Sequence, residues 1–386
     1  MFSQKDIRID DYDYALPEER IALYPLPERD ASKLLVYRNG EISESVFRDI
    51  VDELPADALL VFNDTKVIHA RMVTHTAAGA RIEIFCLEPL EPMEVERAFQ
   101  QRGRCVWRCF VGGNRKWKGE ELRITNGEAL DEVNYELRIG RGKQMGDAWE
   151  IIFEWEDTST FAEVLEAVGK IPLPPYIHRE AEESDEERYQ TIFAKSKGSV
   201  AAPTASLHFS ERVMKTLETK GIETATLTLH VGAGTFKPVT TETIGNHVMH
   251  NEKVIVPPDC LAKILRAKAE GRPIIAVGTT SLRSLESLFW LREGEGCVEQ
   301  WAPYLDNYEL QFNSSTVQQF NTSLMIVPGY HLRIATGIIT NFHQPKSTLL
   351  LLIATMVGDD WRRIYNHALS RDFRFLSYGD ACLLLP

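Results

Sequence analysis

The sequence predicts an α/β fold: a layered α/β domain into which a small antiparallel β-barrel domain is inserted. In both flanks of the chain, strands alternate with loops and helices, which is typical of layered α/β domains. In the middle, short runs of alternating apolar and polar residues are separated by Gly and Asn turns, as in small antiparallel barrels. We therefore expect residues 1–66 and 156–386 to form one discontinuous α/β catalytic domain and residues 67–155 to form the barrel.

The first flank begins with a short helix that two prolines delimit. Pro17 is placed to start this helix in its first turn, and Pro25 ends it. Two apolar runs, residues 34–37 and 59–62, are then expected as strands. In the barrel segment, the alternating runs expected as strands are residues 80–85, 104–111, 121–124 and 149–153.

The second flank alternates helix and strand signals to the end of the chain. Thr160 and Ser210 are of the type that caps helix starts, and Gly169 and Gly221 end the same two helices. The apolar run 274–277 is typical of a strand covered on both faces. The remaining elements that we expect are a strand at 225–231, helices at 259–269 and 282–291, a strand at 334–340 and an apolar helix at 349–357.

Composition places the chain among soluble globular proteins. It has 386 residues, of which 44% are hydrophobic and 26% charged. No apolar run approaches the roughly 18 residues needed to span a bilayer, and the charged first ten residues are unlike a signal peptide. Six cysteines without a CxxC pair are expected to be reduced thiols. We therefore expect a cytoplasmic protein that does not contact a membrane.

The net charge of −13 argues against a general nucleic-acid coat but leaves room for one specific nucleic-acid substrate. A local basic patch in the barrel segment could hold such a substrate, because aromatic residues are interleaved with its cations. An ordinary solvated rim of the barrel is the alternative, and the sequence leaves both open. The patch comprises Arg102, Arg104, Arg108, Arg115, Lys116 and Lys118, with Trp107, Phe110 and Trp117 among them.

Four unusual loops point to a small-molecule site. Residues 198–209 consist largely of small residues without helical or strand periodicity, which suggests close approach of the backbone to a ligand. Residues 232–235, 278–281 and 341–348 each follow a predicted strand, and ligands of open α/β sheets lie beyond the carboxyl ends of the strands. Neither a complete dinucleotide fingerprint nor a complete phosphate loop is present.

Three histidines lie in these loops or, for His230, two residues before one of them, and are candidates for proton transfer: His208, His230 and His343. Asp380 follows an aromatic turn and is either a base or a structural cap. Arg283 could anchor a carboxylate or phosphate, with a surface ion pair as the alternative. The histidine spacing does not suggest a metal site, and we expect none.

Nine motifs, taken together and in order, resemble the family of AdoMet-dependent tRNA ribosyltransferase-isomerases of queuosine biosynthesis. They cover nearly the whole chain, and any one alone would be unspecific. They are residues 24–35, 60–67, 172–176, 187–191, 199–209, 229–239, 276–283, 340–349 and 375–380.

The resemblance implies an α/β domain with an inserted barrel and a reaction that uses AdoMet as substrate. In that reaction the ribosyl part of AdoMet is transferred to the aminomethyl group of a 7-deazaguanine at the tRNA wobble position and isomerised. The product is epoxyqueuosine in tRNA, and adenine and methionine are released. No metal or other cofactor is expected, and we expect a monomer.

The reaction needs a base at the carbon beside the sulfonium, a proton donor for the leaving adenine and an anchor for the methionine carboxylate. We assign His208, His230, His343 and Asp380 to proton handling, and Arg283 and Lys346 to charge anchoring. The residues expected to line the AdoMet pocket are Thr204, Ser206, Gly232, Gly234, Gly278 and Thr279.

The chain departs from the family pattern at two loop positions and in residues 321–325, where we expect a more acidic, apolar run. Ser206 stands where we expect Gly, and Gln344 stands where we expect an aliphatic residue. A side chain at residue 206 could narrow a close approach of backbone to ligand. Two alternatives therefore remain: an AdoMet- or nucleotide-using transferase with a changed acceptor, and a non-enzymatic tRNA-binding protein.

Overall fold

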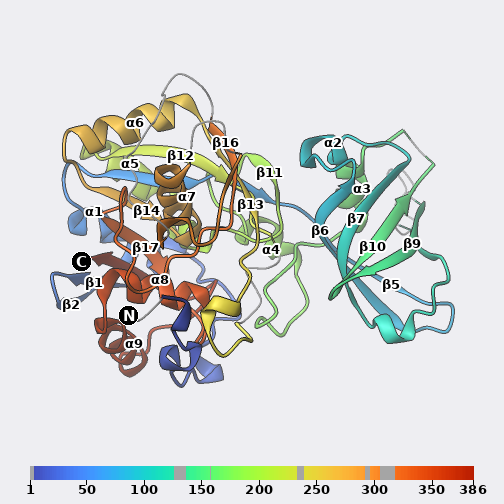
Figure 1. The fold of residues 1–386 in the computed structure, drawn as a ribbon, viewed down its shortest axis with the longest axis horizontal. Coiled ribbons are helices and arrows are strands. Elements are labelled where there is room, and N and C mark those ends of the chain that lie inside the picture. Colours follow the sequence, from blue (N-terminus) through green and yellow to red (C-terminus); the bar gives the residue numbers. More distant parts are fainter. Residues whose placement is uncertain (1–3, 126–135, 157, 233–238, 292–295, 305–317) are drawn as a thin grey trace.

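A computed structural model describes residues 4–125, 136–156, 158–232, 239–291, 296–304 and 318–386. The chain forms a larger layered part and a smaller part that lies at one end of the long axis (Figure 1). The larger part holds the two flanks of the chain, and the smaller part holds strands β5 to β10. The predicted fold class, an α/β domain with an inserted antiparallel barrel, is confirmed.

A ten-stranded sheet in the described residues forms the centre of the larger part, in the order β15-β16-β13-β12-β3-β14-β17-β18-β1-β2. Its middle strands β12, β3, β14 and β17 are parallel neighbours. The strands are β1 Lys33–Arg38, β2 Glu41–Val46, β3 Leu59–Asn63, β12 Glu223–Leu229, β13 Glu252–Val256, β14 Ile274–Val277, β15 Cys297–Val298, β16 Gln318–Thr322, β17 Gly337–Asn341 and β18 Ala381–Leu385.

Strand β3 shows why a central strand of this sheet is almost entirely apolar. Leu59 and Val61 belong to a core that includes apolar side chains of α6, α7 and α8, whereas Leu60 and Phe62 belong to a core that includes side chains of α1 and α5. Both faces of the strand are therefore covered. The helices are α1 Ile50–Glu53, α2 Val95–Phe99, α3 Phe161–Val168, α4 Glu183–Arg188, α5 Glu211–Thr219, α6 Pro258–Ala269, α7 Thr279–Trp290, α8 Thr348–Val357 and α9 Asp360–Ser370.

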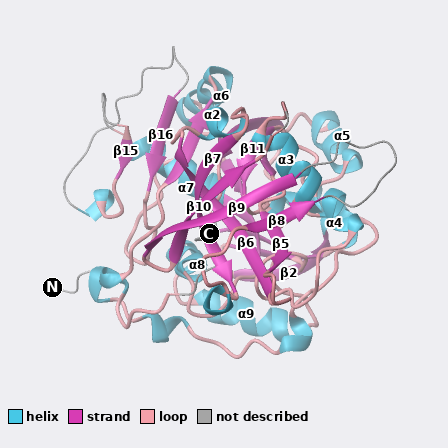
Figure 2. Cartoon of the chain, turned by 90° about the vertical axis from the view of Figure 1, so that its right-hand side faces the viewer, coloured by secondary structure: helices cyan, strands magenta, loops and turns pink. Residues whose placement is uncertain are grey.

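The smaller part is an antiparallel sheet in the order β5-β6-β7-β10-β9-β8. The hydroxyl of Thr74 on β5 donates to the carbonyl of Arg123 on β8 at 2.8 Å, so the two edge strands meet and the sheet is nearly closed. In Figure 2 this part faces the viewer, in front of the larger sheet. The strands are β5 Arg71–His75, β6 Arg81–Glu91, β7 Arg104–Gly112, β8 Leu122–Thr125, β9 Glu136–Met145 and β10 Ala148–Glu154.

The two parts are connected near both ends of the inserted segment. Strands β4 (Thr65–Val67) and β11 (Ser196–Ser199) pair in parallel there. Helix α3 buries Phe161, Val164 and Leu165 in the core of the smaller sheet. The boundaries at residues 67 and 155 stay predictions, and this packing favours a second boundary beyond α3.

Two of the three aromatic residues of the predicted basic patch have a structural role. Trp107 and Trp117 are buried in the core of the smaller sheet, and Arg104 and Arg108 pair with Glu91 and Glu88. These tryptophans therefore do not lie between the cations on the surface. No helix in the described part of the chain has the length and apolar character needed to cross a membrane.

Two expected element bounds near the site differ from the structure. The helix expected at 282–291 begins three residues earlier, at Thr279, because Gly278 turns the chain directly from β14 into α7. Gly278 has φ 90° and ψ 155°, a conformation that residues with a Cβ rarely adopt. The strand expected at 334–340 is Gly337–Asn341. The start of α7 at Thr279 and the end of β17 at Asn341 line the same pocket.

Candidate functional site

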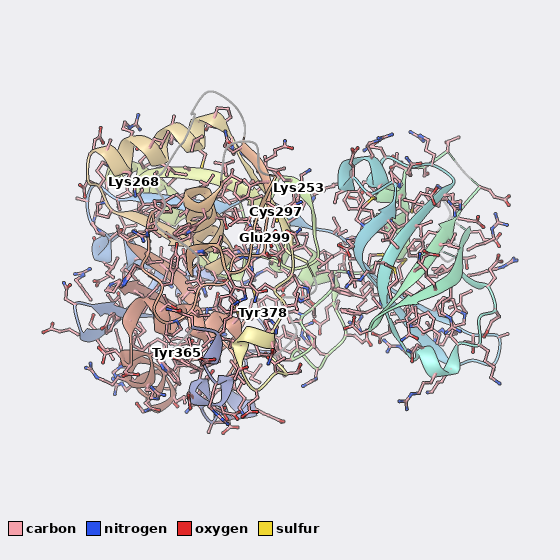
Figure 3. All side chains as sticks on the ribbon, in the orientation of Figure 1. Lys253, Lys268, Cys297, Glu299, Tyr365 and Tyr378 are labelled. Carbon is pink, nitrogen blue, oxygen red and sulfur yellow. The ribbon has the colours of Figure 1, made fainter. Side chains whose placement is uncertain are left out.

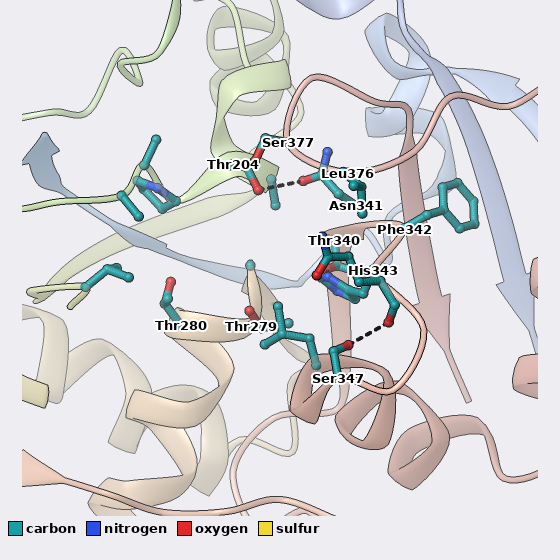
Figure 4. Close-up of a pocket in the computed structure, with 18 of the residues that line it drawn as sticks. Thr204, Thr279, Thr280, Thr340, Asn341, Phe342, His343, Ser347, Leu376 and Ser377 are labelled. Carbon is teal, nitrogen blue, oxygen red and sulfur yellow. Dashed lines mark hydrogen bonds between the residues drawn. The ribbon is translucent and has the colours of Figure 1, made fainter. Parts of the chain in front are cut away.

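A pocket lies at the carboxyl ends of β14 and β17, where the two strands lead toward α7 and α8 (Figure 4). The loop of small residues that follows β11 forms another wall. The lining residues are Tyr176, Tyr189, Ala201–Ala205, Val231, Gly278–Thr280, Thr340–Gln344, Ser347–Leu349, Leu376 and Ser377. Three of the four loops expected at the site, 198–209, 278–281 and 341–348, therefore meet at one pocket, whereas residues 233–235 of the fourth lie outside the described residues.

Two helix starts contribute to this pocket. Helix α7 begins at Thr279, and α8 begins at Thr348 after Ser347, whose hydroxyl accepts from the amide of Leu350 at 3.2 Å. Amide groups at a helix start carry partial positive charge and favour anions. The pocket therefore combines hydroxyl groups with an electrostatic preference for a negative group.

A hydrogen-bonded chain extends from the pocket wall into the core. Thr204 donates to Oδ1 of Asn341 at 3.1 Å (Figure 4), and Nδ2 of Asn341 lies 3.1 Å from Nε2 of His208. Nδ1 of His208 lies 2.8 Å from the hydroxyl of Ser32. Since an amide nitrogen only donates, Nε2 accepts and Nδ1 carries the proton.

His208 does not line the pocket but lies behind its wall, buried beside Asn341. Burial lowers the pKa of His208 to about 4; the positive charge of Arg374 lowers it as well, whereas the negative charge of Asp380 opposes the shift. The imidazole is therefore neutral at physiological pH and fixes the amide of Asn341. This position favours a positioning function over direct proton transfer.

His343 is the predicted histidine that lines the pocket. Its Nε2 lies 2.9 Å from the hydroxyl of Thr340, and its amide donates to the hydroxyl of Tyr365 at 3.0 Å; Tyr365 lies within the larger part (Figure 3). Burial lowers the pKa of His343 to about 3. Within the described residues Nδ1 has no hydrogen-bond partner, so this nitrogen can bind a ligand.

His230 lies next to the pocket-lining Val231, at the end of β12. Its Nδ1 is 3.4 Å from the hydroxyl of Thr65, and a Cβ on Gly198 would lie 2.8 Å from the same nitrogen. The ring is thus packed against the backbone of Gly198, which requires a glycine at φ 146°. His230 is half-buried and close to the pocket, but does not line it.

Arg283 is already neutralised by a protein carboxylate. It forms an ion pair with Glu252, and Glu252 also accepts from the amide of Gly232 at 3.0 Å. Burial lowers the pKa of Arg283 to about 10, which keeps it cationic at neutral pH. Arg283 and Glu252 line a neighbouring cavity that shares Thr279 with the pocket. The predicted residue Gly234 lies outside the described residues.

Two predicted residues lie away from the pocket. Lys346 pairs with Asp10 at 2.9 Å and Asp13 at 3.2 Å, near the start of the chain. Asp380 accepts from the backbone amides of Lys33 at 3.1 Å and Arg374 at 2.8 Å. Asp380 thus organises the turn before β18 and connects it to β1.

The two loop positions that depart from the family pattern differ in their relation to the pocket. Ser206 is fully buried and does not line the pocket, whereas its neighbour Ala205 does. Its hydroxyl has no hydrogen-bond partner among the residues that the structure describes. Gln344, in contrast, lines the pocket. Of the two, Gln344 is therefore the one that a ligand can contact.

Several pocket residues were not predicted individually. Tyr176 and Ser377 are joined through their hydroxyl groups at 2.5 Å, and Tyr189 is buried with a hydroxyl that lacks a partner in the described structure. Asn341 joins the pocket to His208. All four residues lie within the nine sequence motifs, so the motifs themselves were the signal. No cluster of metal-ligating side chains occurs among the described residues.

The fold and the pocket define an α/β protein with a hydroxyl-rich ligand site at the carboxyl ends of parallel strands. A family model described as queuosine biosynthesis protein matches residues 9–384. A relative from Aromatoleum aromaticum is 40% identical, covering 98% of this chain and 97% of its own length. Another from Trichlorobacter lovleyi is 37% identical, covering 98% and 99%. Both are named S-adenosylmethionine:tRNA ribosyltransferase-isomerase.

A crystal structure of an S-adenosylmethionine tRNA ribosyltransferase from Thermotoga maritima is 27% identical, covers 97% of this chain and 100% of its own, and gives a TM-score of 0.48. The family match covers almost the entire chain. This chain belongs to the queuosine biosynthesis protein family. The resemblance inferred from the nine motifs is confirmed.

Proposed function

We propose that this protein transfers and isomerises the ribosyl part of AdoMet onto 7-aminomethyl-7-deazaguanine at the tRNA wobble position. The products are epoxyqueuosine in tRNA, adenine and methionine. The observation that carries this proposal is the 40% identity to a ribosyltransferase-isomerase over 98% of the chain. That similarity includes every segment that lines the pocket.

The pocket has groups suited to the polar parts of AdoMet. Hydroxyls of Thr204, Thr279 and Thr280 are placed to bind ribose or adenine. The starts of α7 and α8 offer amide groups to the methionine carboxylate. We assign the carboxylate to these helix starts because Arg283 and Lys346 already have carboxylate partners.

His343 is the best placed of the four proton-handling candidates. At neutral pH its imidazole is uncharged and can accept the proton from the carbon beside the sulfonium. Negative charge that develops on that carbon favours the imidazolium and offsets the effect of burial. We assign His230 as the second candidate, His208 to positioning Asn341, and Asp380 to the turn before β18.

We further propose that the reaction needs no metal or other cofactor, that the protein is a monomer, and that it acts in the cytoplasm. AdoMet and tRNA are its substrates. The larger part holds the pocket, and we propose that it is the catalytic domain.

The test is adenine release from AdoMet with tRNA that carries the aminomethyl deazaguanine, compared with the same tRNA carrying guanine. We expect release only with the modified tRNA, together with a matching increase in tRNA mass. AdoMet binding without release would favour a changed acceptor and direct attention to Gln344. Absence of AdoMet binding would favour a non-enzymatic tRNA-binding protein.

A further inference from the structure

Three arginines surround a second cavity next to the pocket. Arg29, Arg188 and Arg374 line it, together with Ser377, which lines the pocket as well. Tyr378 is a further lining residue and lies within the larger part (Figure 3). The two cavities are therefore neighbours, separated by the turn that contains Ser377.

Arg29 and Arg188 have no carboxylate partner in the described part of the chain. Arg29 donates to the carbonyls of Gln190 at 2.6 Å and Glu187 at 2.7 Å. Arg188 donates to the carbonyls of Pro27 at 3.1 Å and Leu26. Most other arginines near the site are paired with acids, as Arg374 is with Asp380 at 3.1 Å. The cavity thus has two guanidinium groups that form no ion pair with a carboxylate of the described residues, although the charge of Glu187 acts on Arg29 from a longer distance.

Two further observations indicate that an anion would be stabilised there. Nε of Arg188 is buried and has no hydrogen-bond partner among the described residues. Burial lowers the pKa of Arg29, and the like charge of Arg188 lowers it further, more than either Glu187 or Tyr378 raises it. An oxyanion between the two side chains would reduce their repulsion and satisfy the buried donor, since guanidinium groups bind such anions with paired hydrogen bonds.

We propose that this arginine cavity, defined by Arg29, Arg188 and Arg374, binds a backbone phosphate of the tRNA next to the wobble nucleotide. This inference rests on the proposed function. A methionine carboxylate of AdoMet has the same oxyanion chemistry and is the other possible source. The helix starts of α7 and α8 already offer the carboxylate a site within the pocket, whereas the arginine cavity lies outside it.

An exposed aromatic ring lies beside the arginine cavity, and its hydroxyl donates to Glu182 at 3.0 Å. Tyr24 is 52% exposed and precedes Pro25, which lines the cavity. The guanidinium of Arg179 lies 4.2 Å from the centre of the Tyr24 ring. Exposed aromatic rings and arginine planes are the groups on which unstacked RNA bases stack. A phosphate at the arginines and a neighbouring base on Tyr24 would hold the strand while the wobble base enters the pocket.

The experiment measures binding of an anticodon stem-loop RNA carrying the aminomethyl deazaguanine over a range of KCl concentrations, using fluorescence anisotropy. For Arg188→Gln we expect binding about tenfold weaker than for the unchanged protein, as for loss of one charge-assisted contact. The slope of log affinity against log salt should become shallower by about 0.7, the value for one phosphate of a single strand. Affinity for AdoMet, measured by calorimetry, should stay unchanged.

Two control variants are needed. One separates the effect of the charge from that of the guanidinium geometry, and the other shows whether loss of an arginine elsewhere on the protein affects RNA binding. Arg188→Lys keeps the charge and should keep the salt slope. Arg363→Gln removes an exposed arginine that pairs with Asp360 on α9 and should bind RNA like the unchanged protein. A stem-loop with methylphosphonates on both sides of the wobble nucleotide removes the charge from the ligand instead, so the unchanged protein should show the shallower slope with this RNA.

An unchanged salt slope with Arg188→Gln or with the methylphosphonate RNA would overturn the inference. Weaker AdoMet binding with unchanged RNA binding would overturn it as well and assign the arginines to the methionine carboxylate. RNA binding is measured without turnover. A protein that binds this RNA as expected but releases no adenine would therefore reject the proposed function and retain the phosphate site.

Discussion

The buried His343 makes the stability of the protein depend on pH in a way that can be calculated. Its pKa is about 3 in the folded protein because of burial, compared with the usual 6.5. Between these values the unfolded chain binds a proton that the folded protein does not. The stability contributed by the neutral ring is therefore fully present above about pH 6.5 and is lost as the pH falls toward 3.

The size of the effect follows from the difference in pKa. At about pH 4.5, two units below the unfolded value, the loss is about 2.7 kcal/mol, since each unit corresponds to about 1.4 kcal/mol. A glutamine side chain does not titrate, so the substitution His343→Gln should remove this loss. His208, with a folded pKa of about 4, should contribute a loss of about 2.5 kcal/mol by the same calculation.

Urea unfolding of both proteins, followed by tryptophan fluorescence at about pH 7.5 and about pH 4.5, measures the difference. We expect the free energy of unfolding to decrease less with acid in His343→Gln than in the unchanged protein, by about 2–3 kcal/mol. His331 is exposed, and His331→Gln should leave the decrease as it was. An equal decrease in the unchanged protein and in His343→Gln would refute the assignment of His343 as a buried, neutral group.

Three substitutions test other contacts. Asn341→Ala removes the side chain that hydrogen-bonds to both Thr204 and His208. It should lower kcat/KM for adenine release about tenfold to hundredfold. An unchanged kcat/KM would show that Asn341 does not contribute to the reaction. Gly278→Ala places a Cβ on a residue with φ 90° and should lower the free energy of unfolding in urea by about 1–3 kcal/mol. A smaller loss would show that the turn rearranges. Glu286 is buried and accepts from three backbone amides; Glu286→Gln turns one acceptor into a donor and should cost about 2–3 kcal/mol, and a smaller loss would show that the loop rearranges.

Much of the pocket could be predicted from the sequence, because apolar runs mark the parallel strands and glycine-containing turns or unusual loops mark their carboxyl ends. The run 274–277 is apolar on both faces and ends at Gly278, so its carboxyl end could be placed from the sequence. Parallel strands bring such ends to one edge, which is why Thr204, Gly278, Thr279 and His343 do line one pocket. The family resemblance added the reaction, which no local pattern contains.

The functions of individual side chains were less predictable because their partners come from distant segments. Lys346 lies in a pocket loop, yet its ion-pair partner Asp10 is 336 positions earlier in the chain. The sequence left open whether Asp380 is a base or a cap, and the hydrogen bond that it accepts from the amide of Lys33 depends on the pairing of β18 with β1. The charge of Arg29 was overlooked because the sequence does not show that Arg29 and Arg188 line one cavity.

The position of β18 within the large sheet has a consequence for the order of assembly. This strand, residues 381–385, lies between β17 and β1 and pairs with Leu34 to Arg38 near the start of the chain. During synthesis the hairpin of β1 and β2 leaves the ribosome long before the strand that joins it to the sheet. The hairpin of β1 and β2 can therefore join the sheet only after β18 has been synthesised. Pairing between segments so distant in the sequence slows folding. A chaperone that shields both apolar faces of β1 during this interval would act on a specific, identifiable nascent segment.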